Sequence, residues 1–529
     1  MAKILKVTIS DRLSFALTGQ EELVKYLQVI TTVSLPPPGR PVRGVEREDA
    51  SYCPVILKGR LVTLPRGLSR VLAQACRERG IGMEVVNEVV SDQTAVPADL
   101  DAIPLKPRDY QKQIIDLLIR HKQGWICLPC GGGKTTTGAL AAIATGQPAL
   151  VVVHTKDLQD QWIATFRRAG VQARPAENQA INAGEVVVGI VQGLKSCHVL
   201  LSSVGCLILD ECHHVPANSF LDIIDQCPAR YRWGFTATPK RADGKGFLLD
   251  MIFGSCLFTM TAKELIDLGF LLRPTIIPVL TGWSPTKEHF RWFVECECGG
   301  VTETNWVSWR VNKNATCSNV ISETGPRGGK NRRVCALPLR EDIAVAKRGD
   351  LEFAATLTAL SENAERIALI AKLGSWTLLS RRRLLVLVAR KGAAITTCGV
   401  LRGAGLRASA ISSDVADREG RIRALRLGYS DGLVATSLAD EGLDIPELDT
   451  VISANPSKDS GKAQQRAGRA CRPAGKPPII FDLVDDHHTF TRHWKHRKEA
   501  YIEAYGRECM ARTEPVSVEM ALQIAAGVK

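Results

Sequence analysis

The sequence has no long apolar run. None of its hydrophobic stretches approaches the ~18 consecutive apolar residues that a membrane-spanning helix needs, and the segment Met1-Ala2-Lys3-Ile4-Leu5-Lys6 lacks the apolar core of a secretory signal. No short-period repeat is present either. We therefore expect a protein without a membrane partner that works in the cytoplasm.

Cysteine is dilute for a chain of this length. Sixteen cysteines in 529 residues are too few for a disulfide-stapled scaffold, and Cys127, Cys206 and Cys256 lie inside apolar runs. This pattern favours buried, reduced thiols in a reducing compartment.

Charge is also limited, since charged residues make up 23% of the chain against 45% hydrophobic residues. This composition excludes a disordered chain, and the length predicts about three domains. The 68 Lys and Arg exceed the 55 Asp and Glu, which leaves a net charge of +13. We expect the surface to attract a polyanion, with an attraction that weakens as salt rises.

Two sets of buried-strand runs alternate with helical stretches, which is the rhythm of parallel, doubly wound sheets. The sequence thus predicts two tandem α/β domains with doubly wound parallel sheets, at about 101–272 and 351–510. The first set of strands is Trp125–Leu128, Ala149–Val153, Val186–Ile190 and Cys206–Leu209, and the second is Leu384–Val388, Ala408–Ile411, Gly432–Thr436, Thr450–Ile452 and Ile479–Phe481.

Three further segments complete the predicted organisation. Residues 1–100 alternate short apolar runs with Pro-rich turns, and an amphipathic stretch from Gly67 to Arg79 follows; they predict a small α+β module with a possible contact to nucleic acid. Residues 273–350 form a linker and an insertion that breaks the α/β rhythm. Residues 511–529 are expected to be a C-terminal tail.

A glycine-rich turn follows the predicted strand that ends near Leu128, in the motif Gly131-Gly132-Gly133-Lys134-Thr135. Glycines let backbone N–H groups surround phosphate oxygens at the positive end of the helix that begins at Lys134. Lys134 would then meet the β- and γ-phosphates of ATP, and Thr135 the magnesium. A plain glycine turn before a helix is the alternative, because Leu128 stands where the strict pattern has glycine.

An acidic pair, Asp210-Glu211, follows the predicted strand Cys206–Leu209. Asp210 would hold Mg²⁺, while Glu211 would orient or deprotonate the attacking water. A helix cap is the alternative for this segment alone. Because parallel strands bind ligands at their carboxyl ends, we expect the glycine loop and the acidic pair to lie at adjacent strand ends.

The order of these segments over residues 100–505 resembles the superfamily 2 helicases, in particular the branch of XPB-type, UvsW-type and phage-encoded enzymes. That family tolerates Leu128 in its motif I. The resembling segments are Pro107-Arg108-Asp109-Tyr110-Gln111, Pro129–Thr135, His154–Leu158 with Gln161-Trp162, Val191–Leu194, Asp210–His214, Gly234–Pro239 with Lys240–Gly244, Ala435–Pro446, and Gln465-Arg466-Ala467-Gly468-Arg469-Ala470-Cys471-Arg472.

The resemblance implies roles for further residues. Arg108 and Gln111 would read the adenine, and Gly442 and Asp444 would approach the nucleotide from the second domain. His213, Thr236, Thr238 and Gln465 would couple hydrolysis to strand movement. A metal cluster of His213 with His198, Cys212 and His214 is the alternative interpretation of that histidine.

Arg469 and Arg472 would reach across the cleft between the two domains to the γ-phosphate, as implied by the resemblance of their segment to motif VI. An arginine so placed neutralises charge only when the domains close, so hydrolysis would depend on closure. A basic helix face is the alternative.

The insertion carries Cys296, Cys298, Cys317 and Cys335. Four thiolates could hold one structural Zn²⁺, but the second pair of cysteines is widely spaced. Ordinary reduced cysteines therefore remain the competing interpretation.

The main hypothesis is an ATP-dependent, Mg²⁺-requiring DNA helicase or translocase that acts in replication, recombination or DNA repair, in a bacterial or phage-infected cytoplasm. We expect a monomer with DNA preferred over RNA, and replication or recombination proteins as possible partners. The alternatives are the motor subunit of a restriction-type system, an RNA helicase, and a nucleic-acid-binding scaffold with a catalytically dead nucleotide site.

Overall fold

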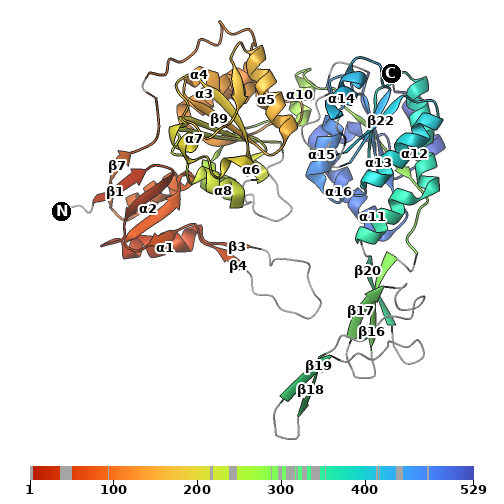
Figure 1. Cartoon of the computed structure of the whole chain (residues 1–529), viewed down its shortest axis with the longest axis horizontal. Helices are drawn as coiled ribbons and strands as arrows, with labels where there is room; N and C mark the ends of the chain where they lie inside the picture. Colours follow the sequence, from red (N-terminus) through yellow and green to blue (C-terminus); the bar gives the residue numbers. More distant parts are fainter. Residues whose placement is uncertain are drawn as a thin grey trace. The chain divides into compact units, whose positions relative to one another are not determined.

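In the computed structural model, the chain folds into two compact units, the first within Met1–Leu272 and the second from Arg273 onwards (Figure 1). The described residues are 4–35, 50–92, 94–214, 218–237, 247–286, 289–295, 301–305, 316, 320–324, 330–334, 346–351, 353–412, 415, 417–436, 445–472 and 476–528.

The N-terminal module, residues 4–35 and 50–87, is a mixed five-stranded sheet in the order β5-β6-β2-β1-β7 with helices packed against it. Alternating burial along β2 indicates a sheet with one covered face. Its elements are β1 (Ile4–Ile9), β2 (Arg12–Ala16), α1 (Glu21–Thr31), β3 (Val33–Leu35), β4 (Ala50–Tyr52), β5 (Ile56–Lys58), β6 (Leu61–Pro65), α2 (Ser69–Glu78) and β7 (Gly82–Asn87).

The rest of the first unit is a seven-stranded parallel sheet in the order β10-β11-β9-β12-β13-β8-β14. Its central strands are buried along their whole length, as expected for a sheet covered on both faces. The elements are α3 (Asp109–His121), β8 (Gln123–Cys127), α4 (Lys134–Thr145), β9 (Ala149–Val153), α5 (Lys156–Arg168), β10 (Ala173–Pro175), β11 (Val186–Ile190), α6 (Val191–Leu194), α7 (His198–Ser203), β12 (Cys206–Leu209), α8 (Asn218–Ile224), β13 (Tyr231–Thr236), α9 (Phe247–Phe253), β14 (Cys256–Thr259) and α10 (Ala262–Asp267).

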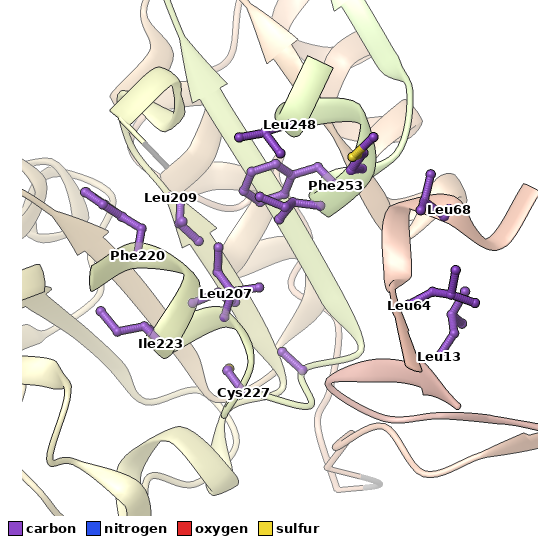
Figure 2. Close-up of a cluster of buried hydrophobic side chains, with 14 of the residues drawn as sticks. Leu13, Leu64, Leu68, Leu207, Leu209, Phe220, Ile223, Cys227, Leu248 and Phe253 are labelled. Carbon is purple, nitrogen blue, oxygen red and sulfur yellow. The ribbon is translucent and has the colours of Figure 1, made fainter. Parts of the chain in front are cut away.

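One hydrophobic core joins the N-terminal module to this sheet. Leu64 and Leu68 of the module belong to the same buried cluster as Leu207, Leu209 and Phe253, and Figure 2 shows side chains of this cluster. Such a shared core holds the module and the parallel sheet as one body.

The second unit contains a six-stranded parallel sheet in the order β15-β25-β24-β21-β23-β22. The segment just after residue 272 supplies β15, and α17 near the C-terminus packs on the core of this sheet through Ala521 and Ala525. The elements are β15 (Thr275–Leu280), α11 (Phe353–Glu362), α12 (Ala364–Leu379), β21 (Leu384–Leu387), α13 (Lys391–Gly403), β22 (Ala408–Ile411), α14 (Arg418–Arg426), β23 (Gly432–Ala435), β24 (Thr450–Ser453), α15 (Ser460–Gly468), β25 (Ile479–Val484), α16 (His488–Tyr505) and α17 (Val518–Ala526).

Two buried ion pairs fix the helices around this sheet. Arg497 of α16 holds Asp482 of β25 at 2.7 Å, and Arg366 of α12 holds Asp485 at 2.9 Å. Tyr501 donates a further hydrogen bond to Asp482 at 2.8 Å. Because a buried charge is costly unless it is paired and hydrogen-bonded, these contacts fix the positions of α12 and α16.

The segment between β15 and α11 forms separate antiparallel ladders. A three-stranded sheet has the order β17-β16-β20, and β18 pairs with β19. Phe290, at the start of β16, packs with Leu360 and Phe490 of the second unit. The strands are β16 (Phe290–Glu295), β17 (Val301–Asn305), β18 (Val320–Thr324), β19 (Lys330–Val334) and β20 (Ala346–Leu351).

The predicted fold class is confirmed, with two parallel α/β sheets and an N-terminal mixed-sheet module. In the part of the chain that the structure describes, no helix is both long and apolar enough to cross a bilayer.

Candidate nucleotide-binding site

The loop between β8 and α4 has the geometry of a phosphate cradle. Gly131 and Gly133 have φ angles of 81° and 75°, in the left-handed region that favours glycine. A Cβ at Gly133 would overlap the Nε2 atom of Gln111. The helix α4 begins directly after this loop without a side-chain cap, so its first N–H groups face the loop as a phosphate-binding helix end requires.

Leu128 occupies the strand end as a core residue. Its side chain is fully buried, and its N–H donates a hydrogen bond to the carbonyl of Thr236 at 3.0 Å. The first position of the strict pattern is therefore used here for packing and strand pairing, and neither role requires glycine.

The acidic pair and the loop lysine meet at one edge of the sheet. Lys134 Nζ lies 3.3 Å from Glu211 Oε1, and the two side chains are only 12% and 13% exposed. Asp210 is buried and its Oδ1 accepts a hydrogen bond from the Glu211 N–H at 2.9 Å. Glu211 itself has a φ of 46°, a left-handed conformation that turns the chain sharply after β12.

The expectation that the two motif-bearing strands are adjacent is wrong. Strand β13 lies between β12 and β8, because order along the chain does not set order in a parallel sheet. The residues still meet, since all three parallel strands end at the same edge of the sheet. Thr236, which ends β13, lies 3.0 Å from His213 Nδ1, and this nitrogen lies 3.4 Å from Glu211 Oε2.

These contacts produce opposite pKa shifts in the two acids. Burial and the neighbouring Glu211 raise the pKa of Asp210, against the lowering effects of Lys134 and Trp162. Burial also acts to raise the pKa of Glu211, but Lys134 and His213 hold it well below its usual range. Burial opposes protonation of Lys134, yet Glu211 and Asp210 raise the pKa of that lysine. The site therefore holds Lys134 and Glu211 as an ion pair.

Trp162 makes a contact with Asp210 that the sequence did not predict. This fully buried residue of α5 donates its indole N–H to Asp210 Oδ2 at 2.7 Å. The sequence places Trp162 in motif Ia, where an apolar periodicity indicates only a buried aromatic side chain. Its indole fixes the orientation of the carboxylate expected to hold the metal.

The Q-type segment contacts the glycine loop from α3. Tyr110 donates its hydroxyl to the Gly132 carbonyl at 2.9 Å, and Gln111 Nε2 donates to the Gly133 carbonyl at 3.4 Å. The Gln111 Oε1 atom accepts from the Arg108 N–H at 2.9 Å. Arg108 also lies over the Phe270 ring, 4.3 Å from its centroid. Gln111, which was expected to bind the adenine, thus also forms a hydrogen bond to the glycine loop.

The residue set fits Mg²⁺ with ATP. Mg²⁺ keeps several waters and uses one or two protein oxygens besides the phosphates. The Asp210 carboxylate and the Thr135 hydroxyl, at the second position of α4, offer such oxygens. Within the described residues, no group of three or more His, Cys, Asp or Glu is placed to hold a metal by protein ligands alone, which disfavours a metal cluster at His213.

The remaining predicted residues belong to the second unit or lie outside the described residues. Gln465 is buried in α15, and Arg469 and Arg472 follow directly after that helix, half-buried. The site that they would complete with the first unit stays a prediction. Thr238, Gly442, Asp444, Cys296, Cys298, Cys317 and Cys335 lie outside the described residues, so the zinc hypothesis also stays a prediction.

Two family models match the chain in the order of its two units. Residues 104–241 match "Type III restriction enzyme, res subunit", and residues 366–474 match "Helicase conserved C-terminal domain". The two matches fall on the two parallel-sheet regions, in the order expected for tandem helicase domains.

The chain is similar to curated proteins of the XPB and Rad25 type. "DNA 3'-5' translocase XPB2" of Sulfurisphaera tokodaii is 31% identical over 186 residues, which are 34% of this chain and 41% of that protein. "Putative DNA 3'-5' helicase Rad25" of Halobacterium salinarum is 24% identical over 386 residues, 71% of this chain and 54% of that protein. The chain thus spans about half, or less, of these relatives' length. They support the XPB part of the resemblance, while a phage origin stays a prediction.

A solved structure supports the fold. S. cerevisiae Dbp5 bound to RNA and ADP BeF3 aligns with a TM-score of 0.53 at 16% identity, covering 80% of this chain and 94% of that chain. This likeness agrees with the tandem RecA-like architecture.

Proposed function

We propose that this chain is an ATP-dependent DNA translocase or helicase of the XPB and Rad25 type, with 3'-to-5' polarity and a role in DNA repair. The observation that carries the proposal is the contact series from Lys134 through Glu211 and His213 to Thr236 at one sheet edge. The names of the relatives supply the DNA substrate and the polarity.

The residues divide the chemistry between them. The glycine loop and Lys134 would bind the phosphates of ATP, and Glu211 would take the proton of the attacking water. Mg²⁺, when bound, neutralises phosphate charge, with Asp210 and Thr135 as its protein partners. Thr236 and His213 would transmit the change at Glu211 to β13. Arg469 and Arg472 would stabilise the transition state from the second unit.

The test is ATP hydrolysis by the wild type and by Lys134→Ala, with and without DNA. DNA is expected to stimulate the wild type, and loss of the phosphate-binding lysine is expected to abolish that activity. Lys195→Ala removes an exposed lysine of the same unit, which pairs with Asp222 on the surface, and should leave it unchanged. Equal rates for the wild type and Lys134→Ala would reject the motor.

Substrate preference is resolved in the same assay. Single-stranded, forked and duplex DNA and RNA of equal length are compared as activators, and strand release from 3'- and 5'-tailed duplexes gives the polarity. Stimulation by RNA alone would replace the DNA proposal with an RNA helicase.

A second candidate is the motor subunit of a restriction-type system, since residues 104–241 match the res-subunit model. In that case DNA-stimulated hydrolysis would require a methyltransferase partner. Stimulation of the purified chain by unmodified DNA alone would exclude this candidate.

A further inference from the structure

A cavity of about 260 Å³ lies inside the first unit, where the N-terminal module meets the parallel sheet. Its walls come from β1 and β2, from the start of α2, from the turn between α3 and β8, and from the segments before β13 and β14. The edge of the sheet that lines it is the amino edge, opposite the glycine loop. This cavity is separate from the nucleotide site.

The lining of this cavity is basic. It includes five basic side chains and no carboxylate. Among the described residues, none of the five forms an ion pair. They are Arg66, Arg70, His121, Lys122 and Arg230. Two of them, His121 and Lys122, lie at the C-terminal end of α3, where the helix dipole favours cations. That explanation does not extend to the three arginines.

Arg66 is the buried member of the set, with only 5% of its surface exposed. Its Nη1 atom donates to the carbonyls of Ser10 and Ala229 at 3.1 and 2.6 Å, and its buried Nε has no hydrogen-bond partner. Burial and the nearby Arg232 lower the pKa of Arg66 to about 9. Asp11 and Cys227 act in the opposite direction but do not offset the lowering. A buried guanidinium that donates its hydrogen bonds to carbonyl oxygens would be stabilised by an anion.

The start of α2 lies in the same wall. Gly67, Ser69 and Arg70 all line the cavity. The first turn of this ten-residue helix contains no acid, and no side chain caps it. A 3-10 turn, Arg66–Leu68, leads into the helix, and the Ser69 N–H donates to the Arg66 carbonyl. Ser255, on the facing wall, lies 3.3 Å from Arg70 Nη1. A helix N-terminus beside arginines is suited to phosphate oxygens.

We propose that this cavity binds a phosphate group, supplied by a nucleic-acid backbone or by a small phosphorylated compound. The volume is below the roughly 300–1,000 Å³ of pockets for drug-sized ligands, so it suits one phosphate with little else. Arg66 would contact it from the floor, and Arg70 and Lys122 from the rim. The nucleic-acid source rests on the proposed function, whereas the small-phosphate source does not.

The test uses the full chain with its nucleotide site saturated with Mg²⁺ and ADP. Arg70→Gln/Lys122→Gln removes two exposed charges of the cavity rim, and Lys58→Gln/Arg77→Gln removes two exposed charges elsewhere on the N-terminal module. In one arm, thermal unfolding is followed against inorganic phosphate. In the other, DNA binding is followed by fluorescence anisotropy at salt concentrations from roughly 50 to 300 mM, which lie on both sides of the physiological ionic strength of about 150 mM.

A cavity for a small phosphate predicts that inorganic phosphate stabilises the wild type and the control more than the cavity variant. A cavity for a backbone phosphate predicts that only the cavity variant loses salt-dependent DNA affinity, with a slope of log affinity against log salt reduced by about one to two. Equal behaviour of the two double variants in both arms overturns the proposal. Failure of the proposed function would appear instead as a wild type without DNA-stimulated ATPase.

Discussion

At the scale of single residues, the indole of Trp162 contacts Asp210, the acid proposed to hold Mg²⁺. Its N–H is the side-chain donor to Asp210 at 2.7 Å. We predict that Trp162→Phe, which keeps an aromatic ring but removes the donor, raises the Mg²⁺ concentration needed for half-maximal ATPase by about 10- to 100-fold. A Mg²⁺ titration of the steady-state rate measures this.

Trp233→Phe is the matched control. Trp233 of β13 is also fully buried, but its indole nitrogen has no hydrogen-bond partner in the described part of the chain. Its replacement by Phe loses volume and packing but removes no hydrogen bond of the indole nitrogen. If both variants require the same Mg²⁺ concentration, the indole of Trp162 does not act on Asp210.

Gly67, at the junction of the module with the parallel sheet, is a position where an added Cβ atom is expected to destabilise the fold. A Cβ there would overlap the backbone carbonyls of Asp250 and Met251 in α9. We predict that Gly67→Ala lowers the free energy of unfolding of the first unit by about 1–3 kcal/mol, because backbone must move to admit the methyl group. Thermal unfolding followed by circular dichroism checks this. Gly193→Ala, which meets open space in α6, should not destabilise the unit.

At the scale of secondary-structure elements, Asp431 ties β23 to β22. Arg407 donates to it from Nη2 at 2.6 Å and from Nε at 3.0 Å. These bonds, with lesser help from Arg383, lower the pKa of Asp431. A carboxyl whose folded pKa is depressed stabilises the fold above its unfolded pKa of about 3.9, and this stability is lost as pH falls through the folded pKa.

We therefore predict that Asp431→Asn lowers the unfolding midpoint of the second unit by roughly 2–4 °C at pH 7. The difference from the wild type should shrink as the pH falls below about 4. Thermal melts from pH 7 to pH 3 give the comparison. Asp222→Asn, in a half-exposed surface pair, should match the wild type throughout, and a constant gap for Asp431→Asn would contradict the titration argument.

Elements were predictable from sequence where burial is uniform. The run Ala149–Val153 is β9 to the residue, because a strand covered on both faces has only apolar positions. The place of β13 between β12 and β8 was not predictable, since spatial order follows from crossovers that leave no local pattern. The bond from Trp162 to Asp210 spans 48 positions and is equally invisible to spacing.

At the scale of the whole molecule, the two units are expected to share one catalytic event. We predict that Arg469→Ala leaves ATP binding nearly intact but lowers the rate of DNA-stimulated hydrolysis by about 10³- to 10⁵-fold, since an arginine finger acts on the transition state. Binding of a fluorescent ATP analogue and steady-state ATPase separate the two effects. Arg423→Ala, exposed on α14, is the control. A proportionate loss of binding and hydrolysis would assign Arg469 to nucleotide affinity alone.

The strands β8 and β13 connect the two sites of the first unit. Both begin at the basic cavity, at Gln123 and just after Arg230, and both end at the nucleotide site, beside the glycine loop and at Thr236. Six residues of strand cover about 17–20 Å. That distance is about twice the Debye length of ~8–10 Å, so mobile ions screen the part of the interaction between charges at the two ends that passes through solvent. We expect an occupant of the cavity to influence the nucleotide site mainly through a displacement of these two hydrogen-bonded strands.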